Sequence, residues 1–522
     1  MSITGMQIIG RQNIAGTGPS LQAVNPADQQ ALSPAWQGAD IHQVNQAVAL
    51  ATTAFASYRE TSLEQRAAFL EAIAQSILDL GDALIDRAML ETGLPRPRLE
   101  GERGRTVNQL RLFARVVRDG DWLDARIDHA LPDRKPAPRS DLRMRQIPLG
   151  PVAIFGSSNF PLAFSVAGGD TASALAAGAP VVVKTHPAHP GTSELVGQAI
   201  RAAVQQCDLH EGVFSLLAGP GIELGLALVR HPGIQAVGFT GSRQGGIALM
   251  QAAAQRPAPI PVYAEMSSTN PVYLLPGALA ARSEALADQF AVSLLGSAGQ
   301  LCTNPGLIIA LEGPDLDRFI AQATRKIQAA PAATMLTTGI AQAYRTGVNH
   351  LLDHPAIQPL ARGLAAEAPA HCQANLALTT AQDFLADPDR LGAEIFGASS
   401  LIIRCATPAE FQAIAQALEG QLTATLHLEP GADDALAAGL IPILELKAGR
   451  ILANGFPTGV EVCDAMVHGG PYPATSDSRT TSVGTLAIRR FLRPVCYQDI
   501  PDRLLPAALQ AANPWRITRT ER

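Results

Sequence analysis

The apolar residues between positions 41 and 118 recur about every 3.6 residues, which is the spacing of one face of an α-helix. The stretch from Leu63 to Ile73 shows this pattern most clearly, and a second helical run is expected to end before Gly93. From Asp119 to Arg145 the chain becomes charged and rich in proline. The alternation of polar and apolar residues from 141 to 147 predicts an exposed strand or arm.

Between residues 151 and 275 the pattern changes to short runs rich in β-branched residues, separated by alanine-rich helical stretches. Strands of about 4–6 residues that alternate with helices predict βαβ units and a parallel sheet. The expected strands cover residues 151–155, 180–184, 213–217, 234–239 and 262–264. Ligands bind such sheets beyond the carboxyl ends of the strands, so a nucleotide is the default ligand. Residues 276–450 repeat the alternation more weakly, which predicts a second α/β domain.

The length of 522 residues exceeds what one hydrophobic core supports, so we expect at least two domains. Hydrophobic residues make up 47% of the chain and charged residues 16%, against about 25% charged in an average domain. This balance favours a surface covered by a second copy, and therefore a homo-oligomer. The formal net charge is −6, and no long basic run occurs. Small molecules are therefore expected as partners, and nucleic acid or a membrane is not.

The six cysteines are widely separated and show neither a disulfide framework nor the paired spacing of a zinc site. We expect reduced thiols and a cytoplasmic protein, because the first residues also lack a basic region followed by an apolar block. The segments 146–169 and 290–311 contain no charged residue. Prolines and polar residues interrupt both segments, which indicates the buried wall of an active site rather than a membrane span.

Two glycine-containing turns each follow a predicted strand and open a helix, as a phosphate-binding turn does. The first covers residues 219–225, but its spacing is not that of the dinucleotide fingerprint, and such turns are frequent for steric reasons alone. The second covers residues 238–242, where Thr240 and Ser242 can donate to a pyrophosphate. The alternative is that Ser242 only caps the helix.

Three residues can carry chemistry, two after predicted strands and one in the uncharged segment 290–311. Cys302 is a candidate nucleophile, although a buried free thiol is more often inert packing. Glu265 follows an apolar strand and has no cation within four residues, so it is either a buried neutral acid or a base with a raised pKa. Asn159 follows the first strand, where its amide can donate to an oxyanion or can simply form a turn before Pro161.

Other reaction templates do not fit this sequence. His186 and His189 form the only H-x-x-H pair, but Pro187 prevents a helix from placing both imidazoles on one face. No third ligand is evident, so no metal is expected. Neither segment 156–160 nor segment 480–484 has both glycines of a G-x-S-x-G elbow, which leaves a serine hydrolase unsupported.

Seven short segments stand out when they are taken together. They are Asn159-Phe-Pro, Lys184, Gly238-Phe-Thr-Gly-Ser242, Glu265, Gly299-Gln-Leu-Cys302-Thr, Glu394-Ile-Phe-Gly397 and Asn454-Gly-Phe-Pro457. Their order and approximate spacing resemble those of the NAD(P)-dependent aldehyde dehydrogenases over nearly the whole chain. The segments that begin at Glu265 and Val467 depart from the common family pattern. These departures resemble the bacterial 2,5-dioxopentanoate (α-ketoglutarate semialdehyde) dehydrogenases, and the NADP-dependent enzymes of luminous bacteria are the second resemblance.

The resemblance implies an aldehyde dehydrogenase fold of the α/β class, with a Rossmann-like coenzyme domain, an α/β catalytic domain and a β oligomerisation arm. Residues 1–127 and 148–267 would form the coenzyme-binding domain, and residues 268–481 the catalytic domain. Residues 128–147 and 482–522 would form the arm and tail. In the family this arm completes a neighbour's sheet, so the resemblance implies a homodimer or homotetramer.

The resemblance also implies a mechanism and its residues. The Cys302 thiolate would attack the aldehyde carbon, and the Asn159 amide with the Cys302 backbone N–H would hold the oxyanion. Hydride would pass to nicotinamide and leave a thioester, which Glu265 would hydrolyse as general base. The implied cofactor residues are Lys184 on the adenosine ribose, Ser242 on the pyrophosphate and Glu394 on the nicotinamide ribose, together with Pro187, Gly221, Gly225, Thr240, Gly241 and Phe396. The implied substrate residues are Arg105, Phe160 and Phe164.

The expected function is NAD(P)-dependent oxidation of a semialdehyde acid to the carboxylate, with 2,5-dioxopentanoate as the expected substrate and 2-oxoglutarate as the product. The alternative is an NADP-dependent dehydrogenase of uncharged aliphatic or fatty aldehydes. A catalytically inactive relative is disfavoured because Cys302, Glu265 and Asn159 are all present. An enzyme that passes the thioester to coenzyme A is disfavoured because that class lacks the glutamate.

Cofactor choice and substrate recognition depend on single positions. Pro187 stands where the family often has an acidic residue that repels a 2′-phosphate, and Ile222 stands where NADP-preferring relatives often have an arginine. We therefore expect both NADP and NAD to be used. Arg105 is expected to bind the distal carboxylate of the substrate. The alternative is that Arg105 is an exposed residue of the helix. A shift of one residue in the alignment with the family would rotate its side chain by about 100° away from the substrate.

Overall fold

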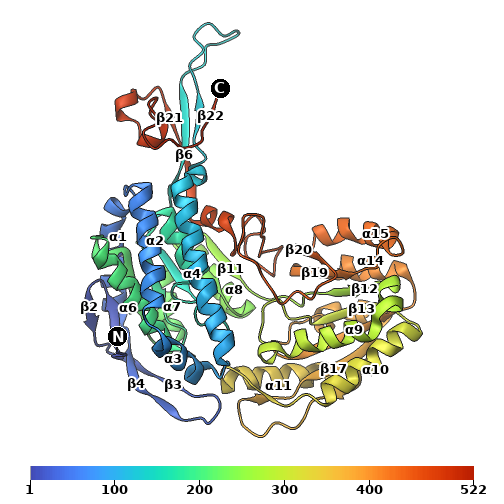
Figure 1. Ribbon diagram of the computed structural model, residues 1–522. Coiled ribbons are helices and arrows are strands. Elements are labelled where there is room, and N and C mark those ends of the chain that lie inside the picture. The colour runs from blue at the N-terminus through green and yellow to red at the C-terminus, as the bar shows by residue number, and fades with distance from the viewer. Residues whose placement is uncertain (1) are drawn as a thin grey trace.

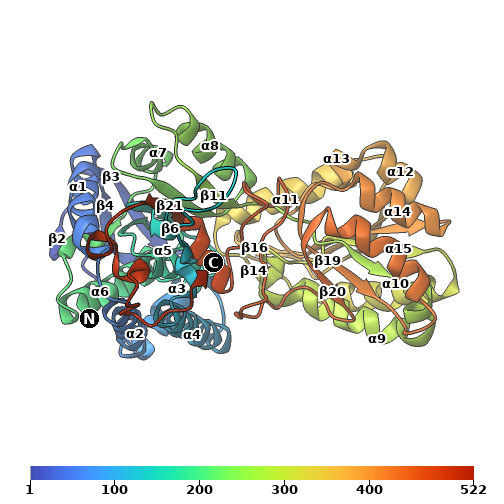
Figure 2. The same ribbon diagram turned by 90° about the horizontal axis from the view of Figure 1, so that it is seen from above.

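The computed structural model describes residues 2–522, which form two α/β units and a smaller sheet that projects from the first unit (Figure 1). Seen from above, the two units lie side by side, and α11 (Thr338–Leu352) lies where they meet (Figure 2). The predicted α/β class is confirmed, since each unit is built on a largely parallel seven-stranded sheet.

The first unit contains a sheet with the strand order β11-β10-β7-β8-β9-β1-β2. Its strands are β1 (Gln7–Ile9), β2 (Gln12–Ile14), β7 (Val152–Phe155), β8 (Val181–Lys184), β9 (Phe214–Leu217), β10 (Ala236–Thr240) and β11 (Val262–Glu265). Strands β7 to β11 are parallel, and β1 and β2 extend the sheet antiparallel. The five strands predicted between residues 151 and 264 are therefore confirmed within one or two residues at their ends.

Helices cover both faces of this sheet. They are α1 (Ile41–Tyr58), α2 (Leu63–Leu78), α3 (Asp82–Thr92), α4 (Arg96–Asp119), α5 (Gly169–Ala177), α6 (Pro190–Gln206), α7 (Ile222–Arg230) and α8 (Arg243–Ala254), with short 3-10 turns at Asp121–Leu123 and Glu211–Val213. Successive strand residues point to opposite faces. Val152 and Ile154 thus pack in one core with α2, α5 and α6, whereas Ala153 and Phe155 pack in another with α1, α7 and α8.

The helices predicted between residues 41 and 118 are confirmed, and their starting points have a local cause. Asp40 and Gln43 form a capping box at the start of α1, and Ser62 and Gln65 form another at the start of α2. The apolar spacing of α2 places Ala67, Leu70 and others on its buried face. No strand was predicted before residue 41, where the chain forms β1, β2 and the hairpin of β3 (Gly18–Val24) with β4 (Ala31–Gly38).

The second unit has the strand order β15-β17-β18-β13-β12-β19-β20, parallel except for β15. Its strands are β12 (Val272–Leu274), β13 (Leu307–Leu311), β15 (Gln358–Arg362), β17 (Asn375–Thr380), β18 (Ser399–Cys405), β19 (Gln421–His427) and β20 (Ala448–Ala453), with a small pair β14 (Ala333–Thr334) and β16 (His371–Cys372). Its other helices are α9 (Pro276–Leu295), α10 (Pro314–Gln328), α12 (Ala381–Ala386), α13 (Pro388–Leu391), α14 (Pro408–Ala417) and α15 (Asp434–Glu445). The 3-10 turn at Gly296–Gly299 follows α9.

The projecting sheet has the order β21-β6-β5-β22. Its strands are β5 (Arg126–Asp128), β6 (Leu142–Pro148), β21 (Leu492–Gln498) and β22 (Thr520–Glu521), and 3-10 turns lie at Thr485–Phe491, Asp502–Leu504 and Ala507–Leu509. The strand predicted within residues 141–147 is β6. Ala487, Ile488 and Phe491, within the expected arm and tail, pack in the same core as α2, α5 and α6. The domain boundaries stay a prediction. Among the described residues, no helix is both long and apolar enough to cross a membrane.

Candidate active site

Cys302 lies in a tight loop that joins α9 to β13. The backbone of Ser297, Ala298 and Gly299 is left-handed, with φ of 52°, 58° and 68°, which is uncommon for residues other than glycine. A Cβ atom on Gly299 would lie 2.2 Å from the backbone nitrogen of Ala398, so only glycine fits there. Asn270 donates from Nδ2 to the Cys302 carbonyl at 2.9 Å. The loop is therefore held in one conformation, and Cys302 of the uncharged segment 290–311 lines two cavities.

Cys302, Glu265 and His468 form a compact cluster. The Sγ atom of Cys302 lies 3.5 Å from Nε2 of His468, and the same nitrogen lies 2.9 Å from Oε1 of Glu265. Ser482 donates from Oγ to the other carboxylate oxygen of Glu265 at 2.7 Å. Glu265 and His468 are buried, with 3% and 0% of their surface exposed. A thiol, an imidazole and a carboxylate in hydrogen-bond contact can move a proton away from sulfur.

Burial raises the pKa of the Cys302 thiol well above its ordinary value, and the negative charge of Glu265 raises it further, while Arg105 acts in the opposite direction. Burial also disfavours the ionised form of Glu265, but the charge of His468 and hydrogen bonds from His468, Ser482 and Cys302 outweigh it and lower the pKa of Glu265. The expectation of a raised pKa for Glu265 is therefore wrong. Two of its stabilising partners, His468 and Ser482, lie 203 and 217 positions away in the chain, where inspection of neighbouring residues does not find them.

His468 and Ser482 are site residues that sequence reasoning missed. The departure of the segment at Val467 from the common family pattern was the one signal that pointed to His468. His468 is separated from Glu265 by 203 positions and from Cys302 by 166. Glu265 is the last residue of β11, where it lies opposite Thr240 in the parallel register. The fold, and no local pattern, brings the three side chains together.

Asn159 lies next to the same loop, after the carboxyl end of β7. Its Nδ2 donates to the Gln300 carbonyl at 2.9 Å, and its side chain is buried. A side-chain amide has two N–H donors, so the second remains for a ligand. The predicted position of Asn159 beside Cys302 fits an oxyanion donor.

A cavity of about 570 Å³ extends from the amino end of α8 to Cys302. Six of the predicted cofactor residues line it, namely Pro187, Thr240, Gly241, Ser242, Glu394 and Phe396. Its lining includes both Ser242 and Cys302. Burial raises the pKa of Glu394 to about 8, so this side chain is mostly a neutral acid near neutral pH.

Three other predicted cofactor residues do not line this cavity. Lys184 donates from Nζ to the carbonyls of Thr185 and Gly219, each at 3.2 Å. Gly221 is the N-cap of α7. A Cβ atom on Gly225 would lie 3.1 Å from the ring of Phe155, so this glycine allows α7 to approach the sheet. The steric reason considered for this turn therefore applies to Gly225.

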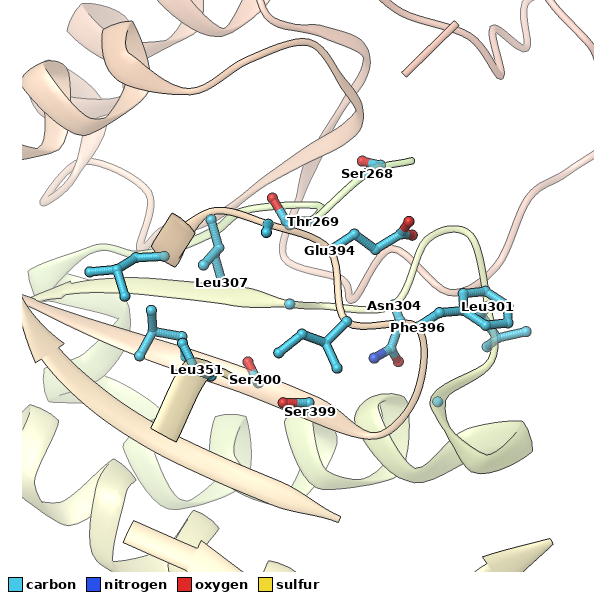
Figure 3. Close-up of a pocket in the computed structure, with 16 residues that line it drawn as sticks. Ser268, Thr269, Leu301, Asn304, Leu307, Leu351, Glu394, Phe396, Ser399 and Ser400 are labelled. Carbon is cyan, nitrogen blue, oxygen red and sulfur yellow. The ribbon is translucent and has the colours of Figure 1, made fainter. Parts of the chain in front are cut away.

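Glu394 and Phe396 come from the loop between α13 and β18, close to the loop that carries Cys302. In Figure 3 the Phe396 ring lies beside Leu301, and the Glu394 carboxylate lies on the side of Ser268. Asn304 donates from Nδ2 to the Gly397 carbonyl at 3.1 Å and so connects the two loops. Residues expected at the nicotinamide ribose are thus positioned relative to the nucleophile by direct contacts.

A second cavity, of about 280 Å³, reaches Cys302 from another direction. The predicted substrate residues Arg105, Phe160 and Phe164 all line it. Arg105 donates from Nη1 to the Val460 carbonyl at 2.9 Å, and its guanidinium carbon lies 5.3 Å from the centre of the Phe164 ring. Its Nε and Nη2 atoms are buried and have no hydrogen-bond partner. The alternative of an exposed helix arginine is therefore wrong.

The cluster of Glu265, Cys302 and His468 also consists of residue types that bind metals, with ligand atoms within 4.8 Å of one another. We assign it to proton transfer, because the imidazole and the carboxylate are already joined by a hydrogen bond. The absence of a metal stays a prediction. In the other candidate pair, His189 is hydrogen-bonded through Nε2 to the Ser157 carbonyl and through Nδ1 to Ser193. Both of its ring nitrogens thus have protein partners.

Comparison with known proteins extends these observations. The model of the aldehyde dehydrogenase family matches residues 14–470. The chain is 59% identical over 522 residues to alpha-ketoglutaric semialdehyde dehydrogenase 2 of Azospirillum brasilense, covering 99% of both chains. It is 47% identical over 515 residues to alpha-ketoglutaric semialdehyde dehydrogenase of Acinetobacter baylyi, covering 99% of this chain and 97% of that one.

The fold is similar to that of solved structures. The apo form of a point mutant of betaine aldehyde dehydrogenase from Staphylococcus aureus matches with a TM-score of 0.81 at 19% identity, covering 96% of each chain. The NAD⁺ complex of betaine aldehyde dehydrogenase from the same organism also matches with a TM-score of 0.81, at 18% identity and over 95% of each chain. These similarities confirm the predicted fold.

Proposed function

The chain belongs to the aldehyde dehydrogenase family, and on this premise we propose that it oxidises 2,5-dioxopentanoate to 2-oxoglutarate with a nicotinamide cofactor. High identity to two alpha-ketoglutaric semialdehyde dehydrogenases over nearly the full chain supports the substrate. The structural observation that carries the proposal is the cavity at Cys302 with unpartnered, buried donors of Arg105 in its wall.

The first step is loss of the thiol proton from Cys302. Because the thiol pKa is raised, the resting group is protonated and needs a base. Glu265 accepts this proton, because its carboxylate is hydrogen-bonded to the thiol, and Nε2 of His468, 2.9 Å from Oε1, holds the carboxylate in place. The proton then passes to solvent through the larger cavity, which Glu265 lines, so that the carboxylate is ionised again before hydrolysis. The thiolate then attacks the aldehyde carbon.

Attack converts the carbonyl oxygen into an oxyanion, which must be stabilised in a site that excludes water. The second N–H of Asn159 and the backbone N–H of Cys302 serve as the donors. The bound nicotinamide supplies the hydride acceptor for this thiohemiacetal. The chain's part is to hold the reacting carbon beside Glu394 and Phe396 in the geometry that favours transfer.

The thioester on Cys302 is then hydrolysed. Glu265 is ionised at neutral pH because its pKa is lowered, and it accepts a proton from the attacking water. The hydrogen bond from Ser482 to Oε2 keeps the carboxylate oriented while Oε1 accepts this proton. The carboxylic acid product leaves, and Cys302 returns to its thiol form.

Arg105 recognises the distal carboxylate of the substrate. A carboxylate removed from water requires a cation or several N–H donors, and Nε and Nη2 of Arg105 are buried without partners. Phe160 and Phe164 pack edge to face, with ring centres 5.2 Å apart, and form the apolar wall along the carbon chain. An uncharged aldehyde would leave the Arg105 donors unsatisfied, which disfavours the alternative substrate class.

Both NADP and NAD serve as cofactor. Pro187 lines the larger cavity and carries no charge that repels a 2′-phosphate, while Ile222 is 74% exposed and supplies no cation to attract one. The protein acts as a homodimer or homotetramer in the cytoplasm. Strand β21 is an edge strand within the described part of the chain, and its outer edge is where a neighbour's strand would pair.

A direct test compares aldehydes of equal length with and without a distal carboxylate. Purified protein is supplied with NADP⁺ or NAD⁺, and the reduced cofactor is followed by absorbance. The proposal predicts that kcat/KM for 2,5-dioxopentanoate exceeds that for pentanal at least about tenfold, the effect of one charge-assisted contact. Equal values would favour an uncharged aldehyde as the substrate.

A further inference from the structure

The larger cavity contains little positive charge. Among the described residues that line it, Arg243 is the only guanidinium or ammonium group, whereas Glu265 is ionised and Glu394 is mostly neutral. Burial lowers the pKa of His186 well below its ordinary value, so this side chain is neutral. A nicotinamide dinucleotide has a pyrophosphate with two negative charges, which must be met by cations or N–H donors once bound.

The guanidinium of Arg243 is already engaged in the structure. It donates from Nε to Oγ of Ser267 at 2.7 Å, and both terminal nitrogens contact the carboxylate of Glu419, one of them at 3.2 Å. Ser267 is buried and follows β11, so it fixes the position of the guanidinium near the cavity. Glu419 lies before β19, and the ion pair therefore joins the first unit to the second.

We propose that Arg243 binds the pyrophosphate of the cofactor and that Glu419 is an internal competitor for the same guanidinium, so that cofactor binding exchanges one partner for the other. The inference rests on the proposed function and names a further binding residue for it. Arg243 is the first residue of α8, directly after Ser242, which caps that helix by accepting from the Gly245 N–H at 3.1 Å. The charge of Arg243 thus adds to the donors at the same helix end.

The exchange is favourable on electrostatic grounds. The side chains of Arg243 and Glu419 are 37% and 41% exposed, and exposed ion pairs contribute little to stability because water screens them. A pyrophosphate offers more negative charge and several acceptor oxygens in a less hydrated cavity, so its contact with a guanidinium is stronger. Glu419 released into water regains its hydration.

The two partners should therefore affect cofactor binding in opposite directions. Arg243→Gln should weaken the binding of NADP⁺ and NAD⁺ about tenfold, and Glu419→Gln should tighten it several-fold by removing the competitor. In the double variant the effect of Glu419→Gln should disappear, because there is no guanidinium left to compete for. Dissociation constants are measured by calorimetry on the full-length protein without aldehyde, so the readout does not depend on turnover.

Two probes separate the pyrophosphate from the rest of the cofactor. Arg243→Gln should weaken ADP-ribose, which contains a pyrophosphate, and should leave adenosine unchanged. Arg404 and Asp317 form a matched exposed ion pair at 2.9 Å outside the cavity, and Arg404→Gln and Asp317→Asn should not change binding. Arg243→Lys keeps the charge and should retain most of the affinity, and melting temperatures check that each variant folds.

The outcomes distinguish the inference from the proposed function. If the wild-type protein binds neither NADP⁺ nor NAD⁺, the proposed function fails. If the wild type binds but Arg243→Gln binds equally well, the inference is overturned. It is also overturned if Glu419→Gln weakens binding as Arg243→Gln does, since the pair would then be a structural brace between the two units.

Discussion

Replacement of Arg105 by alanine tests how the distal carboxylate is recognised. The structure leaves two buried donors of this side chain, Nε and Nη2, without partners, which is enough for one bidentate contact with a carboxylate. Hydrogen bonds to charged groups contribute about 1.5–3 kcal/mol, so removal should lower kcat/KM for 2,5-dioxopentanoate about 10- to 150-fold, mainly through KM. Pentanal, which has no carboxylate, should be affected less than about threefold.

The assay compares steady-state rates for the two aldehydes across Arg105→Ala, Arg105→Lys and Arg111→Ala. Lysine keeps the charge but not the paired donors, and should recover part of the loss. Arg111 lies on the same helix but is exposed, so Arg111→Ala should behave as the wild type. Arg105 also donates to the Val460 carbonyl, and a general disturbance of that loop would slow both aldehydes equally. Equal losses would refute the reasoning and place carboxylate recognition elsewhere.

Three further predictions concern the thiol, its pH dependence and the cofactor. Cys302→Ala should lower turnover by at least about 10⁴-fold with nearly unchanged folding and cofactor binding, and more than about a hundredth of wild-type turnover would contradict its role as nucleophile. Because the pKa of Cys302 is raised, its alkylation by iodoacetamide without cofactor should still increase with pH above about 9. Glu265→Gln removes a negative charge and should shift this pH profile to lower pH. An unchanged profile would show that the two groups are not coupled. The ratio of kcat/KM for NADP⁺ and NAD⁺ should stay below about a thousand in either direction, and a larger ratio would reveal a discriminating group not identified at Pro187 or Ile222.

The fold was largely predictable because its signals are local. Short β-branched runs such as residues 181–184 are buried on both faces, and apolar spacing marks helices such as α2, so elements of these two kinds could be identified from their own sequence. The hairpin of β3 and β4 was not predicted. Its alternation is interrupted by Pro34 and by shifts of register, which weakens the period of two.

The candidate site was predictable only in part, because its electrostatics depend on distant residues. The family resemblance identified Cys302, Glu265 and Asn159. In the structure Glu265 at the end of β11 and Asn159 after β7 both lie beside the loop that carries Cys302. The imidazole of His468, which decides the pKa of Glu265, is 203 positions away, and no spacing rule connects the two. Arg105 was identified by counting along a helix, but its unpartnered donors became visible only with the neighbouring Val460 loop in place.

The most direct test of the account is to trap the covalent intermediate. Glu265→Gln should still form a thioester but hydrolyse it slowly, so that a single turnover of 2,5-dioxopentanoate with NADP⁺ yields about one equivalent of reduced cofactor while steady-state turnover collapses. Mass spectrometry of the quenched protein should then find the acyl group on the peptide that contains Cys302. Wild-type steady-state turnover in this variant, or an acyl group on any cysteine other than Cys302, would contradict the account.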